Sequence, residues 1–428
     1  MDNAMKSPSI DQCLEERQKE RFLNKSRQLA VKYLNKLEEL PGTPNNFTYF
    51  RKILKKAFIE NDTFIRSTNE KIIGTYCVMV PQEIIYAAGA RPVQLCSGNY
   101  AGVHFGDDIV PRDSCPLVKA VVGNNMVSGS SIYDDCSMYI VPITCDCKKK
   151  MAGILKDYKE TLELHVPINK LDDTGMDYYV KELYIMMEKI GRITGKKVTR
   201  IDLEHQIDEM AVVQDEIYRF IQLKGNRNLL IRGSHAMAVM NSFSYDDKTC
   251  WAANLKLLNN ELEVKLKQKN YITKKKLPRI LITGSPIAFP NLKIPLLIEE
   301  MGGVVVADET CMGDRGLYDP VAVCDTSMDG LMRALANRYV LPCSCPIFTE
   351  NRQRIERIKQ MVHDYQVDGV IYHVLRGCLV YDFEYQEMEK VLGELGISMI
   401  RVESDYNEED VEQIKIRMEA FVEMIKFR

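Results

Sequence analysis

The chain has 428 residues, of which 46% are hydrophobic and 27% charged, and its formal net charge is −3. These values are typical of a globular protein with two or three cores. The slightly negative net charge produces no overall positive field that would attract nucleic acid or anionic lipid. No apolar run approaches the roughly 20 residues that span a bilayer. The polar stretch 1–25 lacks the apolar core of a signal peptide. We therefore expect a cytoplasmic protein.

The first 170 residues change character near residue 70. Residues 1–70 are rich in Lys, Glu, Leu and Arg, and they predict a helical N-terminal region broken at 41–44. Short apolar segments then alternate with helical ones. The sequence predicts strands at 92–96, 137–144 and 161–166, with helices starting near residues 79, 116 and 148 and an irregular stretch between 97 and 116. Strand–helix alternation indicates a parallel sheet, so we assign an α/β domain to 71–170.

The rest of the chain divides at Pro278. Residues 171–277 have amphipathic helical periodicity and predict a helical connecting segment, with helices at 176–193, 201–223 and 254–269. Residues 278–428 return to alternation and predict a second α/β domain. Its strands are expected at 279–283, 304–307, 369–373 and 398–402, and its helices at 292–301, 328–339, 351–365, 384–395 and 407–427.

Thirteen cysteines is a high number for a protein of a reducing cytosol, where disulfides are disfavoured. Free cysteines often act as small buried hydrophobes. We expect that packing role for the cysteines that stand alone in the sequence or border predicted strands: Cys13, Cys77, Cys96, Cys136, Cys250 and Cys324.

Two cysteine pairs do not fit the packing role. Cys145 and Cys147, and likewise Cys343 and Cys345, stand two residues apart beside prolines, charges or small polar residues. This spacing indicates metal ligation. It matches neither the paired C-x-x-C of a zinc ribbon nor the compact ferredoxin run.

The predicted elements also place several cysteines at one kind of position. Cys145, Cys311 and Cys378 follow predicted strands, and Cys115 directly precedes a predicted helix. Ligands bind outside the carboxyl ends of parallel strands, so these thiols are expected to converge in a cleft between the two domains. Thiolates suit iron–sulfur clusters, and helix N-termini stabilise the negative charge of a cluster.

Several motifs in order resemble the 2-hydroxyacyl-CoA dehydratase and benzoyl-CoA reductase family. They are Gly74-Thr75-Tyr76-Cys77, Pro81-Gln82-Glu83, Pro111-Arg112-Asp113-Ser114-Cys115-Pro116, Thr144-Cys145-Asp146-Cys147-Lys148, Gly284-Ser285-Pro286, Cys343-Ser344-Cys345, Cys378 with Tyr381 and Glu384, and Glu403-Ser404-Asp405-Tyr406. The resemblance covers roughly residues 70–428. It implies two Rossmann-like domains with a cluster between them, and a [4Fe–4S] cluster held by Cys115, Cys145 and Cys378. It also implies a separate ATP-hydrolysing iron–sulfur activator that supplies one low-potential electron.

The chain departs from the dehydratase pattern in its additional cysteines. Cys147 stands where the dehydratases have glycine, and Cys311 and the Cys343/Cys345 pair add further thiols. Within the resemblance, this favours the double-cubane branch, whose homodimers bind an [8Fe–9S] cluster through six cysteines. The expected ligands are then Cys115, Cys145, Cys147, Cys311, Cys345 and Cys378. Cys345 is preferred to Cys343 because it precedes Pro346, whereas Cys343 follows Pro342.

Three functions remain open from the sequence. The first is reduction of a small molecule at a double-cubane cluster fed by an ATP-dependent reductase, and the second is a 2-hydroxyacyl-CoA dehydratase subunit with one [4Fe–4S] cluster. The third is an electron-transfer protein without catalysis. Neither a Walker motif nor G-x-G-x-x-G is present, so the ATPase is expected to be a partner. His104, in the irregular stretch, is a candidate proton donor, whereas packing is expected for His373.

Overall fold

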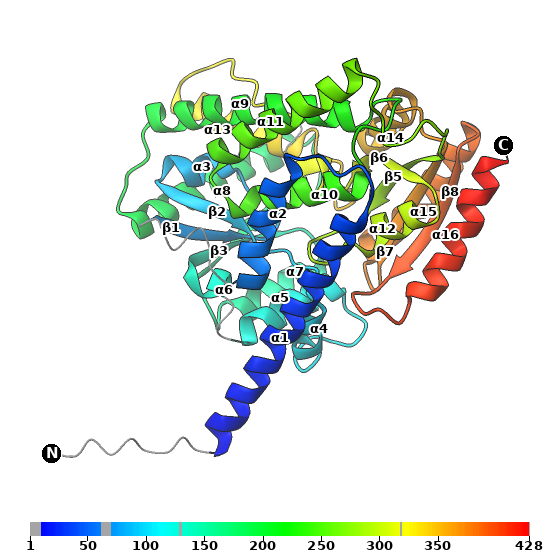
Figure 1. Ribbon diagram of the computed structural model, residues 1–428. Helices are drawn as coiled ribbons and strands as arrows, with labels where there is room; N and C mark the ends of the chain where they lie inside the picture. Colours follow the sequence, from blue (N-terminus) through cyan, green and yellow to red (C-terminus); the bar gives the residue numbers. More distant parts are fainter. Residues whose placement is uncertain (1–9, 61–69, 128–130, 317–318, 428) are drawn as a thin grey trace.

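A computed structural model of the chain describes residues 10–60, 70–127, 131–316 and 319–427. Its strands form two four-stranded sheets, ordered β2-β1-β3-β4 and β6-β5-β7-β8, in which every neighbouring pair is parallel. Figure 1 shows the two sheets in different parts of the molecule, with helices around them. The predicted α/β class with two parallel sheets and helical N-terminal residues is confirmed.

The first sheet consists of β1 (Lys71–Thr75), β2 (Ala90–Gln94), β3 (Cys136–Ile143) and β4 (Thr161–His165). Its helices are α3 (Gln82–Ala87), α4 (Tyr100–Gly106), α5 (Pro116–Met126), α6 (Ser131–Asp135) and α7 (Asp146–Leu155). The two central strands, β1 and β3, pair with each other, and both are almost wholly buried. Continuous apolar strands of this kind are typical of a parallel sheet covered on both faces.

The second sheet consists of β5 (Arg279–Gly284), β6 (Val304–Glu309), β7 (Gly369–Leu375) and β8 (Ser398–Ser404). Its sequence segment also contains α12 (Lys293–Glu300), α13 (Met328–Val340), α14 (Arg352–Asp364), α15 (Leu379–Glu394) and α16 (Val411–Lys426). β5, β6 and β7 are buried along their whole length, whereas β8 is partly exposed at the edge of the sheet.

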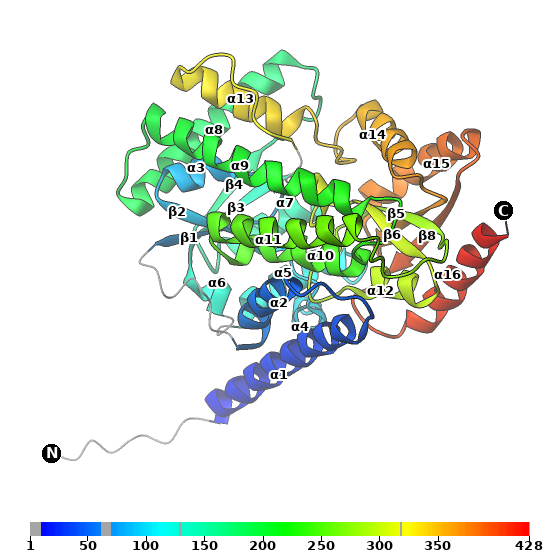
Figure 2. The ribbon, with the colours of Figure 1, turned by 45° about the horizontal axis from the view of Figure 1, so that its top comes forward.

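Long helices connect the two sheets. They are α8 (Asp173–Thr194), α9 (Arg200–Lys224), α10 (Gly233–Ser242) and α11 (Lys248–Lys267). α9 packs against α3 of the first half and also against β6 of the second, so this helical layer spans both sheets. Figure 2 shows α13 lying over α8 and α9, which is where its packing contacts are found. The loop after α13 is thereby brought close to the first sheet.

The N-terminal residues form α1 (Ile10–Glu39), α2 (Phe47–Lys55) and a short π-helical turn at Lys56–Glu60. The beginning of α1 extends away from the rest of the molecule (Figure 1). Among the described residues, no helix is long and apolar enough to cross a membrane. The predicted domain boundaries at 70, 170 and 277 remain predictions.

Four helices or strands among the described residues differ from the sequence-based prediction. Strand β1 and the short helix α6 were not predicted, α4 lies within the stretch expected to be irregular, and α10 lies in a part of the connecting segment where no helix was expected. The predicted strands and the other long helices are present within a few residues of their expected limits. Of the unpredicted elements, strand β1 matters most, because it determines where Cys77 lies.

Candidate iron–sulfur centre

Eight cysteines line one internal cavity of about 170 Å³. They come from both sheet-bearing halves of the chain and are Cys77, Cys96, Cys115, Cys145, Cys147, Cys311, Cys345 and Cys378. Most of the remaining wall is apolar, with Leu117, Val118 and Ile347 among its side chains. The cavity therefore combines soft sulfur donors with a surface that limits water.

The sheets explain why thiols distant in sequence meet here. Cys77, Cys145 and Cys311 are each the second residue after a strand, namely β1, β3 and β6, and Cys378 is the third residue after β7. In parallel sheets the carboxyl ends of the strands share one edge. The cavity lies where the carboxyl edges of the two sheets face each other.

Three of the thiols also stand at helix N-termini. Cys115, Cys145 and Cys378 are the N-cap residues of α5, α7 and α15, and none of their side chains makes a capping hydrogen bond. Free N–H groups and the positive end of the helix dipole favour negative charge at such positions. Three helices thus direct positive potential towards the same cavity.

The thiols of Cys115 and Cys378 interact directly. Hydrogen bonding to Cys378, followed by burial, raises the pKa of Cys115 well above its usual range. The hydrogen bond from Cys115 lowers the pKa of Cys378 to about 7, with help from the hydroxyl of Ser285. These two thiols, although far apart in the sequence, are therefore close enough to bind the same cluster.

Lys148 supplies a positive charge inside the cavity. Its ammonium group donates a 2.5 Å hydrogen bond to the carbonyl oxygen of Tyr76. Burial alone would lower the pKa of Lys148, but the neighbouring thiols, led by Cys77 and Cys96, raise it above its usual range. An ammonium group held here compensates thiolate charge, as expected for an anionic cluster.

A buried ionic network fixes Cys311. Arg315 Nη1 donates to Cys311 Sγ at 3.2 Å and to the hydroxyl of Tyr381 at 2.5 Å. The same guanidinium pairs with Glu309 at 2.6 Å, and both side chains are only 2% exposed. Burial would raise the pKa of Glu309, but Arg315 and Arg354 lower it. The Cys311 thiol therefore has a fixed, positively charged neighbour.

The donor set fits a polynuclear cluster better than a single metal ion. Within the part of the chain that the structure describes, no three His, Cys, Asp or Glu side chains converge closely enough to hold one ion. The thiols instead surround a space. Soft thiolates, an apolar wall and helix N-termini are the features that iron–sulfur clusters require.

The structure brings together all six cysteines that the sequence named, but not every predicted residue. Cys345 lines the cavity, whereas Cys343 is buried beside it and is not part of the wall. His104 lies on α4 with an exposed side chain, in a surface groove formed with α1 and outside the thiol cavity. His373 is buried and bonded to Ser404 and Ser285, in agreement with a packing role.

The predicted packing role holds for some of the cysteines to which the sequence assigned it, and not for others. Cys96 and Cys136 are buried as predicted, but Cys250 and Cys324 are exposed, so that prediction is wrong for them. The side chain of Cys13 lies outside the described residues. Cys77 is half-buried and lines the cavity. Its position could have been found from the apolar run Ile72-Ile73 before Gly74, read as a strand.

Sequence comparisons agree with this arrangement. A family model described as 2-hydroxyglutaryl-CoA dehydratase, D-component, matches residues 77–425. The putative dehydratase subunit YjiM of Escherichia coli (strain K12) is 30% identical over 357 residues, covering 83% of this chain and 91% of that protein.

More distant relatives carry related names. The (R)-phenyllactyl-CoA dehydratase beta subunit of Clostridium sporogenes is 24% identical, covering 84% of this chain and 93% of that protein. A benzoyl-CoA reductase subunit of Thauera aromatica is 25% identical, covering 64% of this chain and 69% of that protein. The chain belongs to the 2-hydroxyglutaryl-CoA dehydratase D-component family.

Proposed function

We propose that this chain is an iron–sulfur subunit of a 2-hydroxyacyl-CoA dehydratase, with its cluster in the thiol-lined cavity. The observation that carries the proposal is the convergence of Cys115, Cys145 and Cys378 at three helix N-termini on that cavity. A bound cluster would supply low-potential, one-electron chemistry. The chain would hold it through these thiolates, balance its charge through Lys148 and exclude water with the apolar wall.

The relatives favour this function over the one that the sequence placed first. Those named above are dehydratase subunits and a benzoyl-CoA reductase subunit, which supports the acyl-CoA alternative. Because relatives are named as subunits, we propose that this chain also works with a second large subunit. An ATP-hydrolysing iron–sulfur activator is the proposed electron source. The position of His104 outside the cavity gives no support to a role in proton donation.

A second candidate is reduction of a small molecule at a double-cubane cluster in a homodimer. The specific observation in its favour is that eight thiols, and not three, line the cavity. Two cubanes joined by a sulfide need six thiolates, and the sequence prediction assigns these to Cys115, Cys145, Cys147, Cys311, Cys345 and Cys378. That assignment remains a prediction.

Anaerobic purification followed by iron and sulfide analysis tests the proposal. About four irons per chain are expected for a single cubane and about eight for two. Turnover of a 2-hydroxyacyl-CoA thioester, with an ATP-dependent activator and a co-purifying second large subunit, would support the dehydratase function. Reduction of another protein without turnover of any thioester would indicate electron transfer alone. A chain that binds no iron after anaerobic reconstitution would contradict all three functions.

A further inference from the structure

Cys77 occupies a position in the first sheet equivalent to that of a predicted ligand. It follows β1 by the same number of residues as Cys145 follows β3, and these two strands are hydrogen-bonded neighbours in the centre of the sheet. Both cysteines line the cavity. The backbone therefore presents Cys77 at the same edge of the sheet as Cys145.

Packing separates the cavity thiols into two groups. Cys343 and Cys345 are buried in an apolar cluster built largely from α3, α8 and α13, and Cys77 packs against that cluster. Cys115, Cys147 and Cys378 pack against the other large apolar cluster. Cys77 thus lies on the same side of the cavity as Cys345, and Cys147 lies on the side of Cys115.

Electrostatic neighbours link Cys345 to Cys77 and Cys311. Burial raises the pKa of Cys345, and the thiols of Cys343, Cys311 and Cys77 raise it further. Cys345 therefore lies near both Cys77 and Cys311, and these two thiols also lie near Cys96. Arg315 holds Cys311 in place on this side through the 3.2 Å contact with its sulfur.

Cys147 has a different environment. It lies in the first turn of α7, directly after Asp146, and its thiol is among the neighbours that raise the pKa of Cys145, after burial. Its neighbours thus belong to the side on which Cys115, Cys145 and Cys378 already supply three thiolates. If Cys147 were a ligand, this side of the cavity would supply four thiolates, and the opposite side would supply only two.

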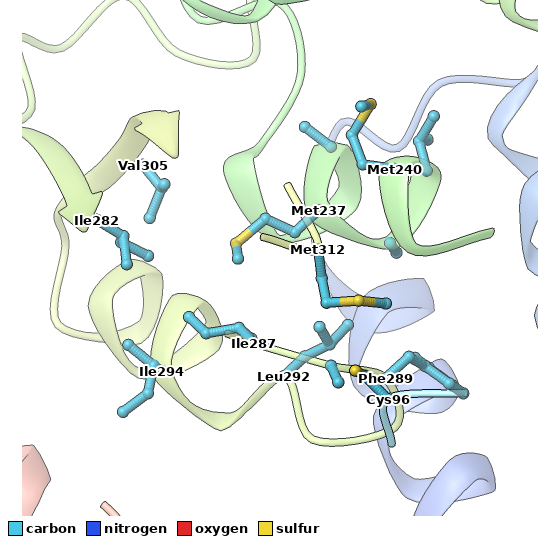
Figure 3. Close-up of a cluster of buried hydrophobic side chains, with 14 of the residues drawn as sticks. Cys96, Met237, Met240, Ile282, Ile287, Phe289, Leu292, Ile294, Val305 and Met312 are labelled. Carbon is cyan, nitrogen blue, oxygen red and sulfur yellow. The ribbon is translucent and has the colours of Figure 1, made fainter. Parts of the chain in front are cut away.

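Cys96 is the remaining cavity thiol, and its environment indicates packing. It is 5% exposed and belongs to the larger apolar cluster. Figure 3 shows it among buried side chains that include Phe289, Leu292 and Met312. The side chain is therefore packed as a small hydrophobe.

We propose that Cys77, Cys311 and Cys345 form a second three-thiol ligand set, opposite Cys115, Cys145 and Cys378, and that Cys147 is not a ligand. This inference rests on the proposed iron–sulfur centre and, within it, on the second candidate, the double-cubane cluster. It replaces one member of the six-cysteine set expected from the sequence. It also gives the described chain two sets of three thiolates, one for each cubane of a double-cubane cluster.

Iron analysis of matched variants tests the assignment. Cys77→Ser is expected to lose about half of the iron of the wild-type chain and to change its low-potential EPR signal. Cys147→Ser and the packing control Cys136→Ser, at a buried cysteine outside the cavity wall, should keep the full iron content. Full retention in Cys77→Ser, or loss of half the iron in Cys147→Ser, would overturn the inference. Failure of the wild-type chain itself to bind iron would instead contradict the proposed function.

A second measurement does not need the cluster or a folded variant. Iron-free wild-type protein is treated with dibromobimane, which bridges neighbouring thiols, and the bridged peptides are identified by mass spectrometry. A bridge from Cys77 to Cys311 or Cys345 is expected, and Cys147 should bridge to Cys145. If Cys77 were bridged only to Cys96, or Cys147 to Cys345, the two ligand sets would be wrong.

Discussion

The backbone of Gly377 lies directly against the carbonyl oxygen of Asp113. A Cβ atom on Gly377 would be 2.2 Å from that oxygen, and the residue has φ +73°. Gly377 precedes Cys378, and Asp113 lies two residues before Cys115. The absence of a side chain at this position allows the two cysteine-bearing loops to meet.

Gly377→Ala is therefore expected to separate Cys378 from Cys115 and to reduce iron binding. The left-handed backbone conformation adds a cost of about 1 kcal/mol for any side chain. Gly396→Ala is the matched control, because Gly396 has the same φ and no atom within 4 Å of the added carbon. The expected result is lower iron content in Gly377→Ala and wild-type content in Gly396→Ala. Equal iron content in both variants would show that the close approach is unimportant for the site.

The proposed primary ligands predict a strong effect on cluster occupancy. Serine in place of Cys115, Cys145 or Cys378 should lower the iron content after anaerobic reconstitution, because oxygen is a poorer donor to iron–sulfur clusters than thiolate. Cys136→Ser is the control, since Cys136 is buried and donates to the carbonyl oxygen of Ile132 at 3.1 Å, away from the cavity wall. Three variants with full iron content would refute the assignment.

Arg315→Gln should destabilise the chain strongly. The substitution leaves Glu309 buried with one of its two cationic partners removed. Breaking a buried ion pair in this way costs about 3–5 kcal/mol in the free energy of unfolding. It also removes the donor to Cys311 Sγ, so iron binding should weaken.

Denaturant unfolding of the iron-free protein measures the effect of Arg315→Gln on stability. Arg192→Gln provides the comparison, because Arg192 is 76% exposed and pairs with Glu188 on the surface. An exposed pair contributes about 0–1 kcal/mol. Similar losses in the two variants would mean that the buried network does not stabilise the fold.

His235 predicts a pH dependence of stability away from the cavity. Burial lowers its pKa to about 4, and its Nε2 atom lies 2.9 Å from the carbonyl oxygen of Leu37. Between pH 6.5 and 4, the imidazole of His235 binds a proton in the unfolded chain but remains neutral in the folded chain. Stability should therefore fall as the pH decreases from about 6.5 to 4, by about 3 kcal/mol from this residue.

Unfolding measured between pH 4 and 8 checks this expectation. His235→Gln should reduce the slope, whereas His205→Gln should leave it unchanged because His205 is exposed. Some pH dependence should remain in His235→Gln, because burial also lowers the pKa of His373 to about 4. An unchanged slope in His235→Gln would contradict the predicted linkage.

Most of the fold could be predicted because the long helices and buried strands have clear periodicity. α4 was missed because Gly102 and Gly106 are poor helix formers, although here they permit close contact with α5. α10 was missed because it is buried on all sides and so lacks an amphipathic pattern. β1 is short and contains Gly74, where a Cβ would clash with Leu95 and Tyr139.

The site could be predicted where a motif marked it, and not elsewhere. Cysteine pairs and strand ends identified Cys145, Cys311 and Cys378. Cys77 was missed because its strand was missed, and Arg315 because its partners Glu309 and Tyr381 come together only through tertiary packing. Such buried charge networks leave no periodic signal in a sequence.

The two sets of cysteines have a mechanical consequence. Cys77, Cys115 and Cys145 lie in loops of the half that contains the first sheet, and Cys311 and Cys378 in loops of the half that contains the second. A cluster bound between them would cross-link the halves much as a disulfide does, and would close very long chain loops. Damage by oxygen would then do more than end the chemistry. It would remove this cross-link, so that the two halves would be held together by the shared apolar core and the helical layer alone.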